Sequence, residues 1–220
     1  MITRQAVVLV GGKGTRLGAL AATTPKPLMP IDDETAFLDE VLFNFIRHGF
    51  DDIVLLAGHL HEQFVARYSS GAMRGANIRV VVESEPAGTA GALRVAAPVL
   101  AETFLFANGD TLFDFNVRQL DEILGGAPQA VAALALRRVP DVSRYGSVEL
   151  KGDSIVAFHE KREASGDGLV NGGTSLMRHE ILSFIEHTPS SIETDVFPRL
   201  AAAGWLKGAE FSGYFIDIGL

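Results

Sequence analysis

A glycine-rich loop near the amino end has the residue types that bind phosphate groups. An apolar run over residues 6–10 predicts a buried strand. Gly11, Gly12 and Gly14 follow that run. Because glycine has no Cβ and can take positive φ, the backbone N–H groups of such a loop can approach an anion. Arg16 adds a planar guanidinium whose donors match a phosphate, so the loop predicts a phosphate site at the end of the first strand.

Two well-known phosphate loops do not match this segment. A Walker P-loop has a glycine five positions before its Gly-Lys pair and Ser or Thr directly after it. Around the Gly-Lys pair at 12–13, Val7 and Gly14 occupy those two places. The dinucleotide fingerprint G-x-G-x-x-G, begun at Gly12, would have Leu17 at its third glycine. An ordinary glycine-rich turn from a strand to a helix is the remaining alternative.

A second cation follows on a stiffened segment. Lys26 lies between Pro25 and Pro27. Each proline fixes its own φ and pushes the residue before it towards extended conformations. We therefore expect Lys26 to hold its ammonium group in a defined place beside the loop, which favours a phosphate site over an ordinary turn.

Two aspartates are predicted to hold a divalent metal. Asp110 follows the strand that we expect over 103–107, at the edge where parallel sheets bind ligands. Asp217 lies in the apolar segment 215–219, where a carboxylate is costly to bury unless it is paired or holds a cation. Mg²⁺ usually takes one or two carboxylates, waters and substrate phosphates. The alternatives are a plain Asn-Gly-Asp turn at 108–110 and a solvent-facing Asp217.

Composition limits the class of partner. With 220 residues, 47% of them hydrophobic and 21% charged, the chain has the make-up of a globular protein. A net charge of −8 argues against a nucleic-acid surface. The absence of cysteine excludes disulfides, thiolate zinc sites and a cysteine nucleophile. The apolar stretch 127–136 is far shorter than the ~20 residues of a membrane span, and no signal peptide is evident. We therefore expect a cytoplasmic protein that binds neither nucleic acid nor membrane.

The order of elements predicts an α/β fold. In the first half, strands and helices alternate, which is the pattern of a parallel sheet covered on both faces. In the second half, strands follow one another, and one helix begins at a capping box of Ser190 and Glu193. We predict one domain, a three-layer sandwich with a mixed, mostly parallel central sheet, in two halves of about 1–115 and 116–220. The expected strands are 6–10, 53–57, 78–82, 103–107, 130–138, 146–150, 154–160, 169–177, 206–211 and 214–217, and the expected helices are 36–48 with Gly49 as cap, 60–68, 89–95 and 190–203.

The segments GGKGTRL and PKPLMP resemble the signature of the sugar-1-phosphate nucleotidylyltransferases, which join a nucleoside triphosphate to a sugar 1-phosphate and release pyrophosphate. The resemblance spans Gly11 to Gly219 and implies a Rossmann-like fold of the nucleotide-diphospho-sugar transferase type. Relatives continue past the position of Leu220 into a C-terminal helix. Within the family, the motifs EPAGTAGAL, NGDTLFDFN, RYGSVEL, VNGGTSLM and GYFIDIG are most similar to the heptose 1-phosphate guanylyltransferases. That similarity implies GTP, a heptose 1-phosphate and Mg²⁺, and a homodimer is one arrangement that we consider.

The resemblance assigns roles to residues whose own pattern suggests less. By themselves, 83–91 would be a proline-glycine turn, and Glu160-Lys161 and Asn171-Gly172 would be a strand end and a turn. Arg16, Lys26 and Asp110 are expected to be catalytic, and Asp110 and Asp217 to hold the metal. Nucleotide binding is expected from Val10, Gly11, Gly12, Gly14, Thr15, Glu83, Glu85, Gly88, Thr89, Asn108 and Gly109, and sugar-phosphate binding from Tyr145, Gly146, Glu160, Lys161, Asn171 and Gly172.

Other functions stay open at this point. Mannose-1-phosphate guanylyltransferases and sugar-1-phosphate uridylyl- or thymidylyltransferases share most of these motifs. A regulatory subunit that binds a nucleotide sugar without making one could lose Arg16, Lys26, Asp110 and Asp217, all of which are present. A glycosyltransferase of similar fold would have an Asp-x-Asp metal pair, but Asn108 occupies the first position.

Overall fold

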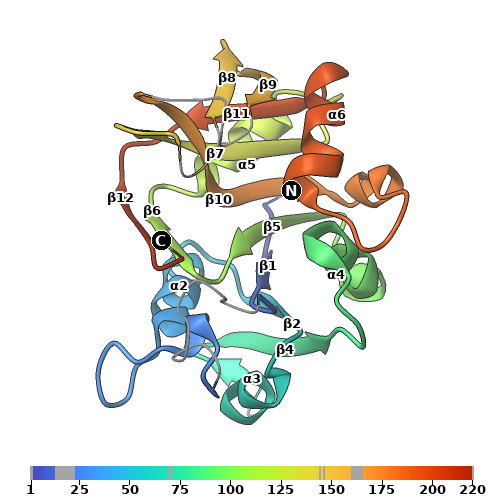
Figure 1. Ribbon diagram of the computed structural model, residues 1–220. Helices are drawn as coiled ribbons and strands as arrows, with labels where there is room; N and C mark the ends of the chain where they lie inside the picture. The colour runs from blue at the N-terminus through green and yellow to red at the C-terminus, as the bar shows by residue number, and fades with distance from the viewer. Residues whose placement is uncertain are drawn as a thin grey trace.

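A mixed sheet of ten strands forms the centre of the molecule, with helices on both faces and a two-stranded ribbon beside it (Figure 1). In the part of the chain that is described, the strand order of the large sheet is β3-β4-β2-β1-β5-β10-β7-β11-β9-β8. The structure is a computed structural model and describes residues 2–12, 23–68, 71–143, 145, 147–159 and 166–219.

Four strands of the first half run parallel in the order β4-β2-β1-β5. Their apolar, β-branched residues suit strands that are buried on both faces, as parallel sheets require. Leu9 pairs with Leu56 on one side and Asn108 on the other, so these strands end at the same edge. The four strands are β1 (Gln5–Leu9), β2 (Asp52–Ala57), β4 (Ala76–Val82) and β5 (Thr103–Asn108), and β3 (Ala72–Met73) pairs antiparallel with β4.

Helices cover both faces of the sheet, which confirms the three predicted layers. On one face, Phe64 of α3 belongs to the same buried cluster as Val8 of β1. On the other face, Leu93 of α4 belongs to a cluster with Val7. None of the described helices approaches the length and hydrophobicity needed to cross a membrane. The helices are α2 (Phe37–Ile46), α3 (His61–Tyr68) and α5 (Arg118–Gly125) on the first face, and α4 (Gly88–Ala96) and α6 (Phe197–Ala202) on the second.

The helix predicted over 36–48 is α2, and it ends where its cap was expected. Leu38, Val41 and Leu42 are fully buried on its apolar stripe. Gly49 has φ +83°, and its N–H donates to the carbonyl of Ile46 at 2.8 Å. Because a side chain at this φ would be strained, glycine is the favourable residue there.

Strands of the second half extend the same sheet. β10 lies between β5 and β7 and runs antiparallel to both, while β11 runs parallel to β7. The sheet is therefore mixed, as predicted, with most of its parallel pairs in the first half. The strands that extend the sheet are β7 (Ala132–Val139), β8 (Ser147–Lys151), β9 (Ser154–His159), β10 (Gly168–Arg178) and β11 (Leu206–Glu210). The separate two-stranded ribbon consists of β6 (Thr111–Asp114) and β12 (Tyr214–Asp217). The short helical turns are η2 (Lys26–Leu28), η3 (Ala97–Val99), η4 (His179–Phe184) and η5 (Ile192–Val196).

The ribbon of β6 and β12 brings the end of the chain back to the edge of the parallel strands. Its register pairs Thr111 with Asp217, and the N–H of Ile218 donates to the carbonyl of Asp110 at 3.0 Å. Since β6 pairs with β12 rather than with β5, residues 108–110 are not the turn of a hairpin. Four phenylalanines hold the ribbon together: the Phe113 ring centroid lies 4.7 Å from that of Phe115, 6.5 Å from Phe211 and 5.3 Å from Phe215.

The predicted capping box of Ser190 with Glu193 is wrong. The cap is Ser191, whose side-chain oxygen accepts from the N–H of Thr194 at 3.3 Å. Asp195 makes the reciprocal bond, since its Oδ2 accepts from the N–H of Ser191 at 2.8 Å. The helix is also divided, because a π-helical turn, η5, precedes α6. Glu193 therefore does not cap the helix. Its side chain makes a different contact, which is described below.

Truncation of Phe113 tests the ribbon's contribution to stability. Phe113 is 2% exposed, so Phe113→Ala should lower the free energy of unfolding by about 3–5 kcal/mol. Chemical denaturation measures this loss. Phe184→Ala serves as the control, because Phe184 is only partly buried, against Trp205. An equal or smaller loss for Phe113→Ala would contradict the assignment of Phe113 as the centre of the aromatic cluster.

Candidate active site

The carboxyl ends of β1 and β5 open onto a cleft of about 240 Å³. These strands are adjacent and parallel. The next strand after β1 in the chain, β2, lies on one side of the pair, and β10 and β7 lie on the other, which is the arrangement at which such sheets bind ligands. Six of the residues predicted from the sequence line the cleft, together with Glu193, which was not predicted. The lining is Leu9, Val10, Gly12, Lys26, Pro27, Thr89, Asn108, Asp110, Ile192 and Glu193.

Three charged groups converge on the backbone of Gly219. The ammonium nitrogen of Lys26 lies 3.4 Å from Oδ2 of Asp110. A Cβ atom built on Gly219 would lie 2.6 Å from Oδ1 of Asp217, 3.1 Å from Oδ2 of Asp110 and 3.2 Å from the Lys26 nitrogen. The backbone N–H of Gly219 donates to Asp217 at 2.6 Å. Residues from the two ends and the middle of the chain therefore meet at one point, as predicted.

Lys26 is a nearly buried cation. It is 8% exposed and begins the turn η2. Pro25 before it has φ −57°, as its ring requires, and ψ 137°. Lys26 itself is in the 3-10 turn, so the expectation that Pro27 would push it towards an extended conformation is wrong. A buried ammonium group is costly unless an opposite charge lies near it, and Asp110 provides that charge. The lysine is thus held at the wall of the cleft.

The two aspartates fit a divalent cation. Asp110 and Asp217 are both half-buried and lie within reach of one point beside Gly219. Within the described ranges, no group of three or more histidine, cysteine, aspartate or glutamate side chains gathers around a metal position. The pair therefore suits a hard cation such as Mg²⁺, which completes its shell with waters and substrate phosphates, rather than a cation held by the protein alone.

Two glycines are required here by close approach of the backbone. A Cβ on Gly109 would lie 2.7 Å from Cγ1 of Val10, and one on Gly11 would lie 2.7 Å from the nitrogen of Gly58. Any side chain at either position would push the strand ends apart. The expectation that positive φ explains the loop glycines is wrong for Gly11 and Gly12, neither of which has positive φ.

Glu83 lies at the end of β4 with a raised pKa. Burial raises the pKa of its carboxyl, and one hydrogen bond from the N–H of Ala87, at 3.3 Å, offsets this only in part. Among the described residues, no cation pairs with Glu83. A half-buried carboxylate without such a partner is unfavourable for folding, and groups with shifted pKa values are common at binding sites.

The start of α4 is docked onto the segment before α6. The carbonyl of Ser190 accepts from the N–H of Ala90 at 2.9 Å, and Oγ1 of Thr89 accepts from the N–H of Ile192 at 2.8 Å. Gly88 has φ +75°, and a Cβ there would overlap the carbonyl of Ser190. Gly88 and Thr89 therefore hold two segments together, whatever else they bind.

Glu85 does not reach the same cleft. It is exposed, and it lines a separate hollow that begins at Ser84 and includes Arg94 and Thr188. A role for Glu85 in nucleotide binding stays a prediction, since Glu85 does not line the cleft that contains Lys26.

Asn171, which is predicted to bind the sugar phosphate, contacts Glu193. Nδ2 of Asn171 donates to Oε1 of Glu193 at 3.0 Å. Gly172 is buried, and a Cβ there would lie 2.7 Å from the ring of Phe113, so its lack of a side chain serves packing. Tyr145 packs in a small cluster with Val139, Val142 and Val170, apart from the lining of the central cleft.

Glu193 had a usable signal in the sequence. It lies in the segment Ser-Ile-Glu-Thr-Asp at 191–195, where its spacing from Ser190 fits a capping box. Because Asp195 makes that bond, Glu193 can project into the cleft. The remaining predicted residues, Gly14, Thr15, Arg16, Gly146, Glu160 and Lys161, lie outside the described residues.

Together these features define an α/β domain with a cleft at the edge of its parallel strands, lined by a lysine and acidic side chains. The model of the nucleotidyl transferase family matches residues 5–220, and the chain belongs to this family.

Two relatives and one solved structure illustrate the similarity. D-glycero-α-D-manno-heptose 1-phosphate guanylyltransferase of Aneurinibacillus thermoaerophilus is 32% identical over 218 residues, which are 98% of this chain and 93% of that protein. Mannose-1-phosphate guanylyltransferase of Mycobacterium tuberculosis is 34% identical over 226 residues, covering 100% of this chain and 62% of that protein. The crystal structure of HddC from Yersinia pseudotuberculosis complexed with GMP-PN has a TM-score of 0.84 and 27% identity, covering 99% of this chain and 95% of that one.

Replacement of Glu83 tests whether its raised pKa makes the free energy of unfolding depend on pH. An acid whose pKa is raised on folding binds more protons in the folded state, so stability falls as pH rises above the acid's ordinary pKa. Glu83→Gln removes this dependence and retains an acceptor for Ala87. The variant should gain stability relative to the original protein at about pH 7 and lose that advantage at about pH 4.

Thermal unfolding at both pH values measures the difference. Glu85→Gln, in the same loop but exposed, should change neither value. A Glu83→Gln variant that is no more stable near neutral pH would mean that burial of this carboxylate is fully compensated.

Proposed function

We propose that this protein is a sugar-1-phosphate guanylyltransferase that joins GTP to D-glycero-α-D-manno-heptose 1-phosphate and releases pyrophosphate. The observation that carries the proposal is the meeting of Lys26, Asp110 and Asp217 around Gly219, at the end of β5, in a cleft that Gly12 also lines. A nucleotidyl transferase must bring two anionic substrates together, and this site offers a cation and a carboxylate pair for that purpose.

The reaction requires alignment and charge neutralisation. A phosphate oxygen of the sugar 1-phosphate attacks the α-phosphorus of GTP, the bond from that phosphorus to the bridging oxygen breaks, and pyrophosphate leaves with the electron pair. Transfers of this type depend mainly on positioning and on electrostatic stabilisation of the phosphoryl oxygens. Lys26 would stabilise the α-phosphoryl group or the attacking phosphate, and Arg16 the leaving pyrophosphate. No covalent bond to the protein is needed.

Asp110 and Asp217 would hold Mg²⁺. A bound Mg²⁺ would offset negative charge on the phosphates. The carboxylates themselves contribute orientation: Asp110 is tied by its carbonyl to Ile218, and Asp217 accepts from the N–H of Gly219. The backbone of Asp110 and the carboxylate of Asp217 are thus held in place by the end of the chain.

Several observations support the choice of substrates. The relatives named for heptose 1-phosphate match this chain over 93–95% of their own length, whereas the mannose-1-phosphate relatives are matched over 60–62%. A carboxylate at Glu83 can accept from guanine N1–H and N2–H₂, and the Asn171–Glu193 pair offers polar groups for sugar hydroxyls. Mannose 1-phosphate is the second candidate. A cytoplasmic location and a homodimer are further parts of the proposal.

A substrate matrix tests the assignment. Pyrophosphate release is followed for each nucleoside triphosphate with mannose, glucose and heptose 1-phosphates, with and without Mg²⁺. GTP with the heptose 1-phosphate should be the fastest pair, and turnover should require Mg²⁺. Faster turnover with mannose 1-phosphate would favour the second candidate. Release from no pair would favour a regulatory subunit that binds nucleotide sugars without making them.

Removal of the Lys26 ammonium group tests its role directly. Lys26→Ala should lower kcat by about 10²- to 10³-fold, the usual effect of losing one preorganised electrostatic contact. Steady-state kinetics with saturating substrates measures this. Lys151→Ala is a control, because Lys151 is an exposed lysine of β8. Full turnover by Lys26→Ala would remove Lys26 from the mechanism.

A further inference from the structure

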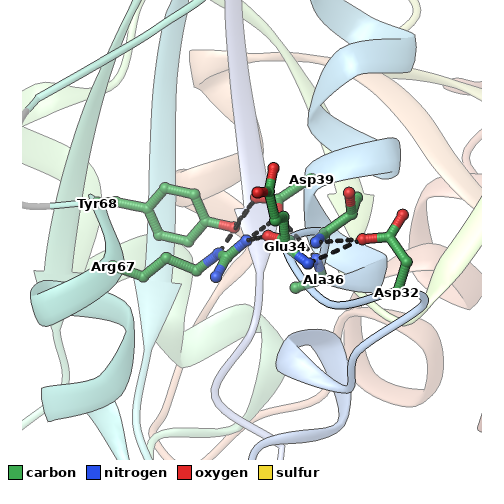
Figure 2. A network of polar contacts seen from close by, with 7 residues as sticks. Asp32, Glu34, Ala36, Asp39, Arg67 and Tyr68 are labelled. Carbon is green, nitrogen blue, oxygen red and sulfur yellow. Dashed lines mark hydrogen bonds and ion pairs between the residues drawn. The ribbon is translucent and has the colours of Figure 1, made fainter.

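A buried carboxylate network lies next to the segment that carries Lys26. Asp39, on α2, is 8% exposed. Arg67 and Tyr68, on α3, point toward it in Figure 2. The Tyr68 hydroxyl donates to Oδ1 of Asp39 at 2.8 Å, and the Arg67 guanidinium pairs with both carboxylate oxygens. Burial raises the pKa of Asp39, but the hydrogen bonds that it accepts outweigh burial and hold the pKa below its ordinary value. The carboxylate is therefore charged at neutral pH.

The network binds the backbone of residues 34–36, which follow Lys26 in the chain. Oδ2 of Asp39 accepts from the N–H of Ala36 at 2.8 Å, and Arg67 donates to the carbonyl of Glu34 at 2.9 Å. Asp32 closes the same loop, since its Oδ1 accepts from the N–H groups of Glu34 and Thr35 at 2.9 and 2.7 Å. Figure 2 shows these contacts converging on one short stretch of backbone.

That stretch is bonded in turn to the backbone of the lysine. Ala36 pairs with Pro30, and the N–H of Phe37 donates to the carbonyl of Met29 at 2.9 Å. The N–H of Met29 donates to the carbonyl of Lys26 at 3.0 Å. A continuous path of hydrogen bonds therefore runs from Asp39 to the residue whose ammonium group lines the cleft.

Helix α3, which carries Arg67 and Tyr68, also contacts the segment that precedes Lys26. Nε2 of Gln63, one turn before Arg67 on α3, donates to the carbonyl of Thr23 at 2.8 Å. α3 thus contacts the segment on both sides of Lys26, at Thr23 and at Glu34. The flanking prolines restrict local φ angles, but they do not place the segment relative to the sheet. The contacts of Thr23 and Glu34 with α3 place the segment there.

We propose that Arg67 and Gln63 are positioning residues for Lys26, with Asp39 and Tyr68 holding Arg67 in place. The lysine side chain has four rotatable bonds, so the place of its nitrogen depends on where its backbone is held. A displacement of about 1 Å at a reacting group can change a rate by about 10²-fold. As a statement about turnover, the proposal rests on the proposed function; as a statement about where Lys26 lies, it does not.

Two variants and two matched controls test the proposal by kinetics. Arg67→Ala should lower kcat about tenfold or more, and Gln63→Ala about threefold, with smaller changes in KM, since the group they place stabilises the reacting phosphoryl group. Arg79→Ala removes the ion pair of Arg79 with Asp52, at the amino end of β2, and should leave kcat unchanged. Gln119→Ala, an exposed glutamine of α5, should do the same.

A double variant separates positioning from general loss of structure. If Arg67 acts through Lys26, Arg67→Ala should lower kcat no further in a protein that already carries Lys26→Ala. Equal losses in both backgrounds would overturn the proposal. Should Arg67→Ala fail to fold, Arg67→Lys, which keeps the charge but cannot reach both Asp39 oxygens and Glu34 together, takes its place, and Gln63→Ala remains a test by itself.

A chemical probe tests the position of Lys26 without any turnover. The side chains of Lys26 and Lys207 are 10% and 18% exposed, so both should react slowly with an amine-acetylating reagent, as followed by mass spectrometry. In Arg67→Ala and Gln63→Ala, acetylation of Lys26 should accelerate several-fold relative to Lys207, and in Arg79→Ala it should not. An unchanged rate at Lys26 overturns the proposal. If no substrate pair turns over but the labelling responds, the proposed function fails and the positioning role stands.

Discussion

Two carboxylates and a nearly buried ammonium group occupy one small volume beside Gly219, and much of the structure serves to keep them there. Two carboxylates repel each other at short range, so the arrangement is stable only when a cation or N–H donors lie close. Lys26 and the N–H of Gly219 supply these in the structure. The ribbon of β6 and β12 brings residue 217 next to residue 110, and its phenylalanine cluster ties that ribbon to β11 and its following loop.

Close backbone contacts hold the surrounding loops at fixed distances. Gly11 lies against Gly58, Gly109 against Val10, and Gly88 against Ser190. In each case a methyl group would separate two segments that border the cleft. The two large buried clusters each contain residues from both halves of the chain, so the two halves pack against each other. The two halves of the chain are therefore joined in two ways, by the central sheet and by the contact of α4 with the segment around Ser190 and Ile192.

Lys26 is held by two kinds of constraint that act over different lengths of chain. Its neighbouring prolines restrict the backbone locally. The network of Asp39, Arg67 and Tyr68 connects its loop to α3, about forty residues away. The network contains a charged pair that is largely shielded from water, and such a pair is weak evidence for stability by itself. Its value is better explained by geometry, because it defines where one loop lies on the sheet.

The sequence by itself determined the layers, most strand positions, the Gly49 cap and the three charged residues of the site. These follow from short-range patterns: apolar periodicity, glycine and proline positions, and the rule that parallel strands end at one edge. It did not reveal Glu193, because the same acid fits a capping pattern, nor the true cap formed by Ser191 and Asp195. It also did not show the pairing of β6 with β12 or the contact of Asp39 with Arg67. Nor did it show that Glu85 lines a hollow separate from the cleft of Lys26. Those features depend on which distant segments meet, and local preference carries little information on that point. Only the packed structure decided them, since each contact became available once the sheet and helices had brought its partners within reach.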